Sequence, residues 1–198
     1  KENYSVTYKA DGYRMLLYIP PDSESLMINY KKNVISTGLI IGEAWKGNTV
    51  IDGEYMEDSN TYLAFDIVID KSNDVSNKSY LERYQLLLNF DKSFEKEEKS
   101  LAMDFKIKPS FIRGRDIGPG LRFETLFSAN SEMLNYISKE KIKFDGLIFY
   151  PPGGYRDEIA MKWKPNDMRT IDMRLILSKS ELSQAKSGSR VSGMVLVT

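Results

Sequence analysis

Apolar and polar residues alternate along the first third of the chain, in short runs bounded by turn-forming residues. Runs of this length that are rich in β-branched and aromatic residues are typical of β-strands. We expect strands over residues 6–8, 15–19, 26–30, 33–36, 49–55 and 62–69. Pro20-Pro21 closes the second of these strands, and Lys31-Lys32 lies at the turn of a hairpin. The first third is therefore predicted to be a meander of short strands.

The period of the apolar positions changes in the middle of the chain. Apolar residues in residues 79–90 recur at helical spacing, and Ser79 with Glu82 forms a capping box. A second helix is expected over residues 124–139. Between them, residues 94–100 are dense in charge and residues 113–120 form a glycine-rich loop that carries arginines.

Strands return after the second helical segment. We expect them over residues 146–150, 159–164, 171–177 and 191–197, and one further strand, residues 103–109, between the two helices. Strands with two helical insertions predict an α+β fold with largely antiparallel sheets and flanking helices.

Length, composition and charge limit the class of protein. The 198 residues suffice for one large domain, or for one domain and part of another. With 41% hydrophobic and 28% charged residues the composition is typical of a soluble globular protein. The net charge is zero, so any RNA contact must come from a local basic patch. No apolar run is long enough to span a bilayer and no signal peptide is visible, so no membrane partner is expected.

The chain contains neither cysteine nor histidine. Disulfides, thiolate catalysis and cysteine metal sites are therefore excluded, which fits an intracellular setting. The usual general base and the usual transition-metal ligand are missing as well. Catalysis would have to use lysine, arginine, carboxylates, hydroxyls and a hard cation such as Mg²⁺.

The stretch Y-K-A-D-G-Y-R, residues 8–14, holds the first candidate for chemistry. We expect Gly12 to enter a tight turn in a left-handed conformation, which would hold Lys9 against Arg14. A lysine amine has an unperturbed pKa of about 10.4, and desolvation or neighbouring cations lower it and free the amine for covalent chemistry. Lys9 is thus a candidate nucleophile and Arg14 a candidate neighbouring cation; the alternative is a solvated lysine beside a turn.

Four further segments follow in order. They are D-G-E-Y at residues 52–55, Y-L-A-F-D at 62–66, D-G-L-I-F at 145–149 and M-K-W-K-P at 161–165. Together with the lysine stretch they resemble the motifs of the covalent nucleotidyltransferases, which comprise mRNA capping guanylyltransferases and ATP-dependent DNA and RNA ligases. Asp145, where ligases usually carry glutamate, and the K-W-K-P run followed by T-I-D look more like the capping enzymes. The resemblance extends from about residue 6 to residue 172 and implies the nucleotidyltransferase fold.

The resemblance implies a two-step reaction. The Lys9 amine would attack the α-phosphorus of GTP, expel pyrophosphate and form a lysyl–GMP, and GMP would then pass to the diphosphate 5′ end of an RNA. Such chemistry depends on charge neutralisation and in-line positioning. By resemblance, Lys162 and Lys164 would bind the α-phosphate and Asp145 would coordinate Mg²⁺ or Mn²⁺.

The remaining implied roles concern the nucleoside. Arg14 and Glu54 would hold the ribose hydroxyls, and Phe65 would stack on guanine. Each role has a structural alternative: an exposed strand edge for the two lysines, a core position for Phe65, and turns at Asp145-Gly146 and Asp52-Gly53. Glu54 is harder to explain structurally, because an unpaired buried carboxylate is costly.

The family pattern also sets expectations for domains and partners. We expect a nucleotidyltransferase domain over residues 1–172, and the start of an OB-fold domain or C-terminal strands over residues 173–198. By resemblance, the chain is part of a larger capping protein with triphosphatase or methyltransferase domains in the same or a partner chain. It would act in the nucleus, or in the cytoplasm if it is viral. Two alternatives stay open: the adenylation domain of an ATP-dependent ligase, and a non-enzymatic nucleotide-binding module of the same fold.

Overall fold

A computed structural model describes residues 4–21, 24–39, 47–92, 103–112, 126–140, 144–157, 159–165, 173–176 and 194–197. The chain divides into two compact units, residues 1–163 and residues 164–198. The predictions for residues 94–100 and 113–120 lie outside the described residues. No helix among the described residues is long and apolar enough to cross a membrane.

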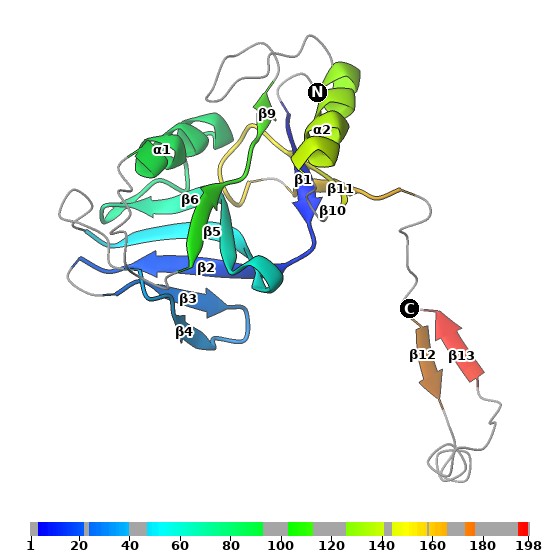
Figure 1. The fold of residues 1–198 in the computed structure, drawn as a ribbon, viewed down its shortest axis with the longest axis horizontal. Helices are drawn as coiled ribbons and strands as arrows, with labels where there is room; N and C mark the ends of the chain where they lie inside the picture. The colour runs from blue at the N-terminus through cyan, green and yellow to red at the C-terminus, as the bar shows by residue number, and fades with distance from the viewer. Residues whose placement is uncertain are drawn as a thin grey trace. The chain divides into compact units, whose positions relative to one another are not determined.

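The larger of two sheets in the first unit contains the predicted meander (Figure 1). In spatial order its strands are β4 (Val34–Ser36), β3 (Leu26–Asn29), β2 (Tyr13–Ile19), β5 (Thr49–Met56), β6 (Thr61–Asp70) and β7 (Asn73–Asp74). These neighbours pair antiparallel, whereas β8 (Asp104–Ile107) pairs in parallel with β6. A short 3-10 helix, η2 (Glu57–Ser59), connects β5 and β6. The two-residue strand β7 and η2 are too short to leave a periodic signal in the sequence.

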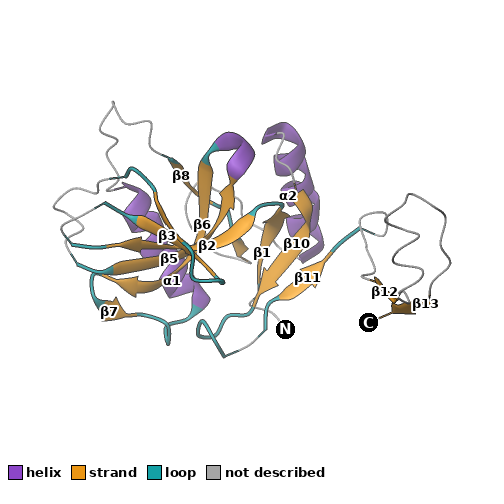
Figure 2. Cartoon of the chain, turned by 90° about the horizontal axis from the view of Figure 1, so that it is seen from below, coloured by secondary structure: helices purple, strands orange, loops and turns teal. Residues whose placement is uncertain are grey.

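The second sheet has four strands and begins with the strand that carries Lys9. Its order is β11 (Met161–Trp163), β10 (Phe144–Tyr150), β1 (Ser5–Ala10) and β9 (Phe111–Ile112). Helix α2 (Leu126–Glu140) lies beside this sheet (Figure 2), and its Met133 and Ile137 share a buried apolar cluster with Val6 and Leu147. The predicted α+β fold with mostly antiparallel sheets is confirmed.

Helix α1 (Tyr80–Lys92) covers one face of the larger sheet. Its N-terminus has the predicted capping box, because Glu82 Oε2 accepts from the Ser79 N–H at 3.0 Å and Ser79 Oγ accepts from the Glu82 N–H at 3.3 Å. The apolar side of the helix, with Tyr80, Tyr84 and Leu87, belongs to the main core cluster of the large sheet.

The link from β1 to β2 carries the chain from one sheet to the other at Asp11-Gly12. The expectation that Gly12 has a left-handed backbone is wrong: the described glycines with positive φ are Gly38, Gly47 and Gly146. Space explains the glycine instead, because a Cβ there would lie 2.7 Å from both Met56 Sδ and the Tyr55 carbonyl oxygen. A side chain at this position would force the link away from strand β5.

In the second unit, the described residues form an antiparallel pair, β12 (Met173–Ile176) with β13 (Met194–Val197). Two predicted strands are therefore present. The assignment of this region to an OB fold stays a prediction.

Candidate active site

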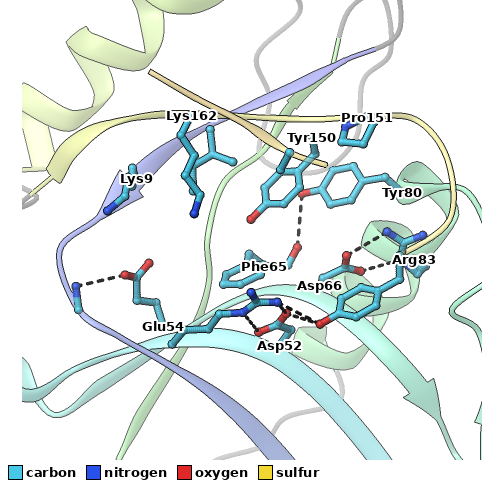
Figure 3. A pocket seen from close by; sticks show the side chains of 15 residues that line it. Lys9, Asp52, Glu54, Phe65, Asp66, Tyr80, Arg83, Tyr150, Pro151 and Lys162 are labelled. Carbon is cyan, nitrogen blue, oxygen red and sulfur yellow. Dashed lines mark hydrogen bonds and ion pairs between the residues drawn. The ribbon is translucent and has the colours of Figure 1, made fainter. Parts of the chain in front are cut away.

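A cavity of about 350 Å³ lies between the two sheets and brings together residues far apart in the sequence (Figure 3). Its lining includes five of the seven predicted site residues, namely Lys9, Arg14, Glu54, Phe65 and Lys162. They come from five different strands: β1, β2, β5, β6 and β11. The site is thus built by the fold rather than by any one segment.

The Lys9 amine is paired with a carboxylate from the neighbouring strand. Lys9 faces Gly146 in the β1–β10 register, so the adjacent Asp145 reaches it. Lys9 Nζ lies 2.7 Å from Asp145 Oδ1 and 2.9 Å from Oδ2, and about a fifth of each side chain is exposed (22% and 21%). Asp145-Gly146 lies within strand β10, so the alternative of a turn there is wrong. The pair places a lysine amine and an acid together at the cavity.

Lys162 lies on the same face of the small sheet as Lys9. It faces Ile148 in the β10–β11 register, and Ile148 in turn faces Thr7, two residues before Lys9. Trp163 faces Leu147 and so points to the opposite side, as the alternation of the strand predicts. Lys164 belongs to the second unit, and its predicted role stays a prediction.

Glu54 lies at the end of the cavity where Lys9 lies (Figure 3). Its Oε1 accepts a hydrogen bond from the Gly12 N–H at 3.2 Å. Burial raises the pKa of this carboxyl, and Lys108, the Gly12 N–H and Lys9 oppose that rise. Asp52-Gly53 lies within strand β5 rather than in a turn, and the close approach of the Tyr62 ring leaves no room for a Cβ at Gly53.

Arg14 turns toward a fully buried carboxylate instead of toward Lys9. Arg14 Nε and Nη2 donate to Asp52 Oδ1 and Oδ2 at 3.1 and 2.6 Å. Tyr155 Oη donates to Asp52 Oδ2 at 2.6 Å and accepts from Arg14 Nη2 at 3.2 Å. The hydrogen bonds to Asp52 raise the pKa of Arg14, so its charge is fixed. The structure thus pairs Arg14 with Asp52. None of these hydrogen bonds joins Arg14 to Lys9, so the role of Arg14 as a cation next to Lys9 stays a prediction.

A second guanidinium–carboxylate pair closes the far end of the cavity. Arg83 from α1 donates through Nε and Nη2 to Asp66 Oδ1 and Oδ2 at 2.8 and 3.0 Å, and both side chains are buried. Its Nη1 donates to the carbonyl oxygens of Lys78 and Gly153. Burial raises the pKa of Asp66, and the Arg83 guanidinium opposes this rise.

Phe65 lies at the cavity wall as part of a series of stacked rings. Its ring centroid is 6.0 Å from that of Tyr150, which lies 4.8 Å from that of Tyr80. Only 7% of Phe65 is exposed, so it serves the core and lines the cavity at once. The two readings of Phe65 from the sequence are therefore compatible.

Lys108 is a buried cation directly behind this wall. It is 1% exposed, and its Nζ lies 5.0 Å from the Phe65 ring centroid and 5.3 Å from that of Tyr8. Among the described residues its amine has no hydrogen-bond partner. Burial lowers the pKa of Lys108 to about 8, and Glu54 opposes this effect.

Sequence reasoning missed Arg83, Lys108 and Tyr155, and it quoted Asp52 and Asp66 without giving them a role. One signal was present for Arg83: it stands within the apolar stripe of α1, next to Tyr80 and Tyr84. An arginine in such a stripe requires a buried acid. The other two residues lie in irregular segments, where periodicity carries no information.

The residues present can be tested against the metal ion that the resemblance implies. No group of three acidic side chains comes together among the described residues. Mg²⁺ in phosphoryl-transfer sites is usually held by one or two carboxylates together with substrate phosphates and water. Asp145, the carboxylate paired with Lys9, could be a ligand of that kind.

Comparison with known proteins gives the same family as the motifs. The family model described as "mRNA capping enzyme, catalytic domain" matches residues 1–166. The mRNA-capping enzyme of African swine fever virus (strain Badajoz 1971 Vero-adapted) is 28% identical over 177 residues, which is 85% of this chain and 18% of the viral protein. That of Mus musculus is 27% identical over 200 residues, 89% of this chain and 31% of the mouse protein.

The chain thus spans less than a third of these curated relatives. Among solved structures, the ligase domain of LigD from M. tuberculosis matches with a TM-score of 0.51 at 16% identity, over 82% of this chain and 53% of that chain. At such identity the match concerns the fold alone.

Proposed function

This chain belongs to the family of mRNA capping enzyme catalytic domains, and from that premise we propose that it transfers GMP from GTP to the diphosphate 5′ end of RNA through a lysyl–GMP on Lys9. The observation that carries the proposal is the position of the Lys9 amine, which lies at the cavity between the Asp145 carboxylate and the face that bears Lys162. An amine can lose its proton and attack phosphorus, which a guanidinium cannot.

In the first step the Lys9 nitrogen bonds to the α-phosphorus, and the bond from that phosphorus to the bridging oxygen of pyrophosphate breaks. Lys162, on the same sheet face as Lys9, would neutralise α-phosphate oxygens, and we propose the same role for Lys164. Asp145 would hold Mg²⁺ or Mn²⁺, which supplies further charge neutralisation at the phosphates when bound. In the second step the RNA diphosphate displaces Lys9 from phosphorus.

The buried amine of Lys108 supports guanine as the base. We propose that this ammonium, which lies behind Phe65, reaches the edge of a base stacked on the cavity side of the ring; it can only donate hydrogen bonds and has no partner among the described residues. At the corresponding position of its edge, guanine presents a carbonyl oxygen and adenine an amino group. Guanine would satisfy the ammonium, whereas adenine would oppose a donor to a donor.

The other end of the nucleoside falls to Arg14 and Glu54. Both line the cavity, and they are direct partners in the β2–β5 register. Carboxylate oxygens accept from hydroxyl groups and guanidinium N–H groups donate to them, so the pair suits the ribose hydroxyls.

Partners and location belong to the same proposal. The relatives are much longer than this chain. We propose that it works with further capping domains, a triphosphatase or a methyltransferase, in the same or a partner chain. The site of action would be the nucleus, or the cytoplasm in a viral setting.

Incubation with α-labelled GTP or ATP and Mg²⁺ or Mn²⁺, followed by a denaturing gel, tests the proposal. We expect label that survives denaturation with GTP, well above that with ATP. Preferential labelling by ATP would assign the chain to the ligases. Binding of GTP with no label from either nucleotide would assign it to the non-enzymatic modules.

A further inference from the structure

Residues 151–157, the first part of the loop between β10 and β11, are tied to α1 and to the segment in front of it. The Tyr155 N–H donates to the Ser76 carbonyl at 2.8 Å, and the Tyr80 N–H donates to the Pro152 carbonyl at 3.1 Å. Arg83 Nη1 adds a bond of 3.2 Å to the Gly153 carbonyl. The loop, which leaves the small sheet, is therefore fastened to the helix that covers the large sheet.

Fastened in this way, the loop delivers Tyr155 into the cavity, together with Pro151. Its hydroxyl hydrogen can be donated only once, and the 2.6 Å distance to Asp52 Oδ2 assigns it there. The hydroxyl oxygen is then free to accept from Arg14 Nη2 at 3.2 Å. The phenol thus joins the acid and the guanidinium in one closed set of hydrogen bonds.

Arg14 is an exposed side chain that needs such support. Its side chain is 69% exposed although Asp52, its partner, is fully buried. An exposed arginine side chain has many rotamers, and fixing one of them costs conformational entropy. Two partners, Asp52 and Tyr155, restrict the guanidinium to the orientation that lines the cavity.

We propose that Tyr155 is a positioning residue for nucleotide binding, which holds Arg14 in the orientation that receives the ribose of GTP. The inference rests on the proposed function and extends it to a residue outside the motifs. Tyr155 does not act as an acid or base: burial and the Asp52 carboxylate raise its pKa, so the phenol stays protonated and keeps its bond to Asp52. Its effect is therefore on affinity for GTP and not on bond formation at Lys9.

Tyr155→Phe tests the inference, with Tyr18→Phe as the matched control. Tyr18 also donates its hydroxyl to a side chain, Asn48 Oδ1 at 2.6 Å, but it is not part of the cavity lining. We expect Tyr155→Phe to raise the Kd of a fluorescent GTP analogue and the KM for GTP about fivefold, with the saturating rate of adduct formation within about twofold. Tyr18→Phe should change none of these.

A double-mutant cycle with Arg14→Ala separates positioning from a structural role. If Tyr155 acts through Arg14, Tyr155→Phe has no further effect on the Kd once Arg14 is removed. If Tyr155→Phe raised the Kd as much in the Arg14→Ala background as in the unmodified chain, the inference would be overturned. A lower melting temperature of Tyr155→Phe with an unchanged Kd would overturn it as well. The Kd for the GTP analogue can be measured without catalysis. Absence of label in the unmodified chain would therefore refute the proposed function, and the effect of Tyr155→Phe on the Kd would still test the inference.

Discussion

Two cations are buried in or behind the wall of the cavity, and their surroundings differ completely. Arg83 is 2% exposed and donates to both oxygens of Asp66 and to two backbone carbonyls. Lys108 is 1% exposed, lies between two aromatic rings and has no hydrogen-bond partner among the described residues. Burial costs both cations their hydration free energy, and only the guanidinium gains compensating hydrogen bonds from the protein.

The difference separates structure from function. A buried ion pair with every donor satisfied fixes a fold, whereas a buried cation without a partner destabilises it. A buried cation without a partner in the protein is expected where a bound ligand accepts its hydrogen bonds. We therefore infer that Arg83 mainly holds the cavity together, whereas Lys9, Lys162 and Lys108 act on the substrate. Four predictions test this difference between Arg83 and the amines.

Exchange of an amine for a guanidinium at Lys9 has the largest expected effect. We predict that Lys9→Ala and Lys9→Arg both abolish the covalent nucleotide adduct, because neither side chain can attack phosphorus. Lys9→Arg can keep an ion pair with Asp145, so circular dichroism and the melting temperature should stay close to those of the unmodified chain. Label retained in either variant would remove Lys9 from its proposed role.

Loss of the satisfied cation should cost stability. We predict that Arg83→Met lowers the free energy of unfolding by about 3–5 kcal/mol, because it leaves Asp66 buried without its partner. Lys106→Met is the control: Lys106 is 62% exposed and lies 3.5 Å from Asp104, a pair worth about 0–1 kcal/mol. Denaturant unfolding measures both, and a loss below about 1 kcal/mol for Arg83→Met would contradict the structural role.

Loss of the Lys108 ammonium should weaken the preference for guanine without destabilising the fold. We predict that Lys108→Met reduces the preference for GTP over ATP by about 1–3 kcal/mol, since it removes one buried donor to the base. The free energy of unfolding should stay equal or rise, because methionine fills the space without a charge. Kinetics of labelling with both nucleotides provide the measurement, and Lys106→Met is again the control. An unchanged preference would exclude Lys108 from base recognition.

The pH dependence of stability provides the finest test. The pKa of Lys108 is about 8 in the folded chain, against about 10.4 for an unperturbed lysine. Between these values the unfolded chain binds more protons, so the free energy of unfolding rises with pH. We predict that unmodified chain gains about 1 kcal/mol relative to Lys108→Met between pH 8 and pH 9. A constant difference across this interval would mean that the Lys108 amine is not desolvated.

The sequence was informative where chemistry lies in regular strands. Lys9, Glu54 and Lys162 were predicted because their segments follow the order of a family's motifs, and all three line the cavity. Alternation along β11 correctly separated Lys162 from Trp163. The two helices and most strands also followed from periodicity. The short β7 and β9 could not be predicted, because two residues show no period.

What the sequence could not reveal depends on contacts between distant segments. Lys108 is 43 positions from Phe65 and 100 from Tyr8, and nothing in its neighbours indicates that it lies between their rings. Tyr155 stands in a loop of proline and glycine, where no pattern predicts a bond to Asp52. Gly12 was read as a residue needed for its backbone angles, whereas the structure needs it for space.

Mass spectrometry of the adduct tests the central claim most directly. The chain is incubated with an equimolar mixture of GTP and ATP and a divalent metal ion, and digested at alkaline pH because acid cleaves a phosphoramidate. The account predicts a mass increase of one GMP on the peptide that contains Lys9, with AMP on the same peptide far less abundant. An adduct on any other lysine, or AMP in excess of GMP on Lys9, would contradict it.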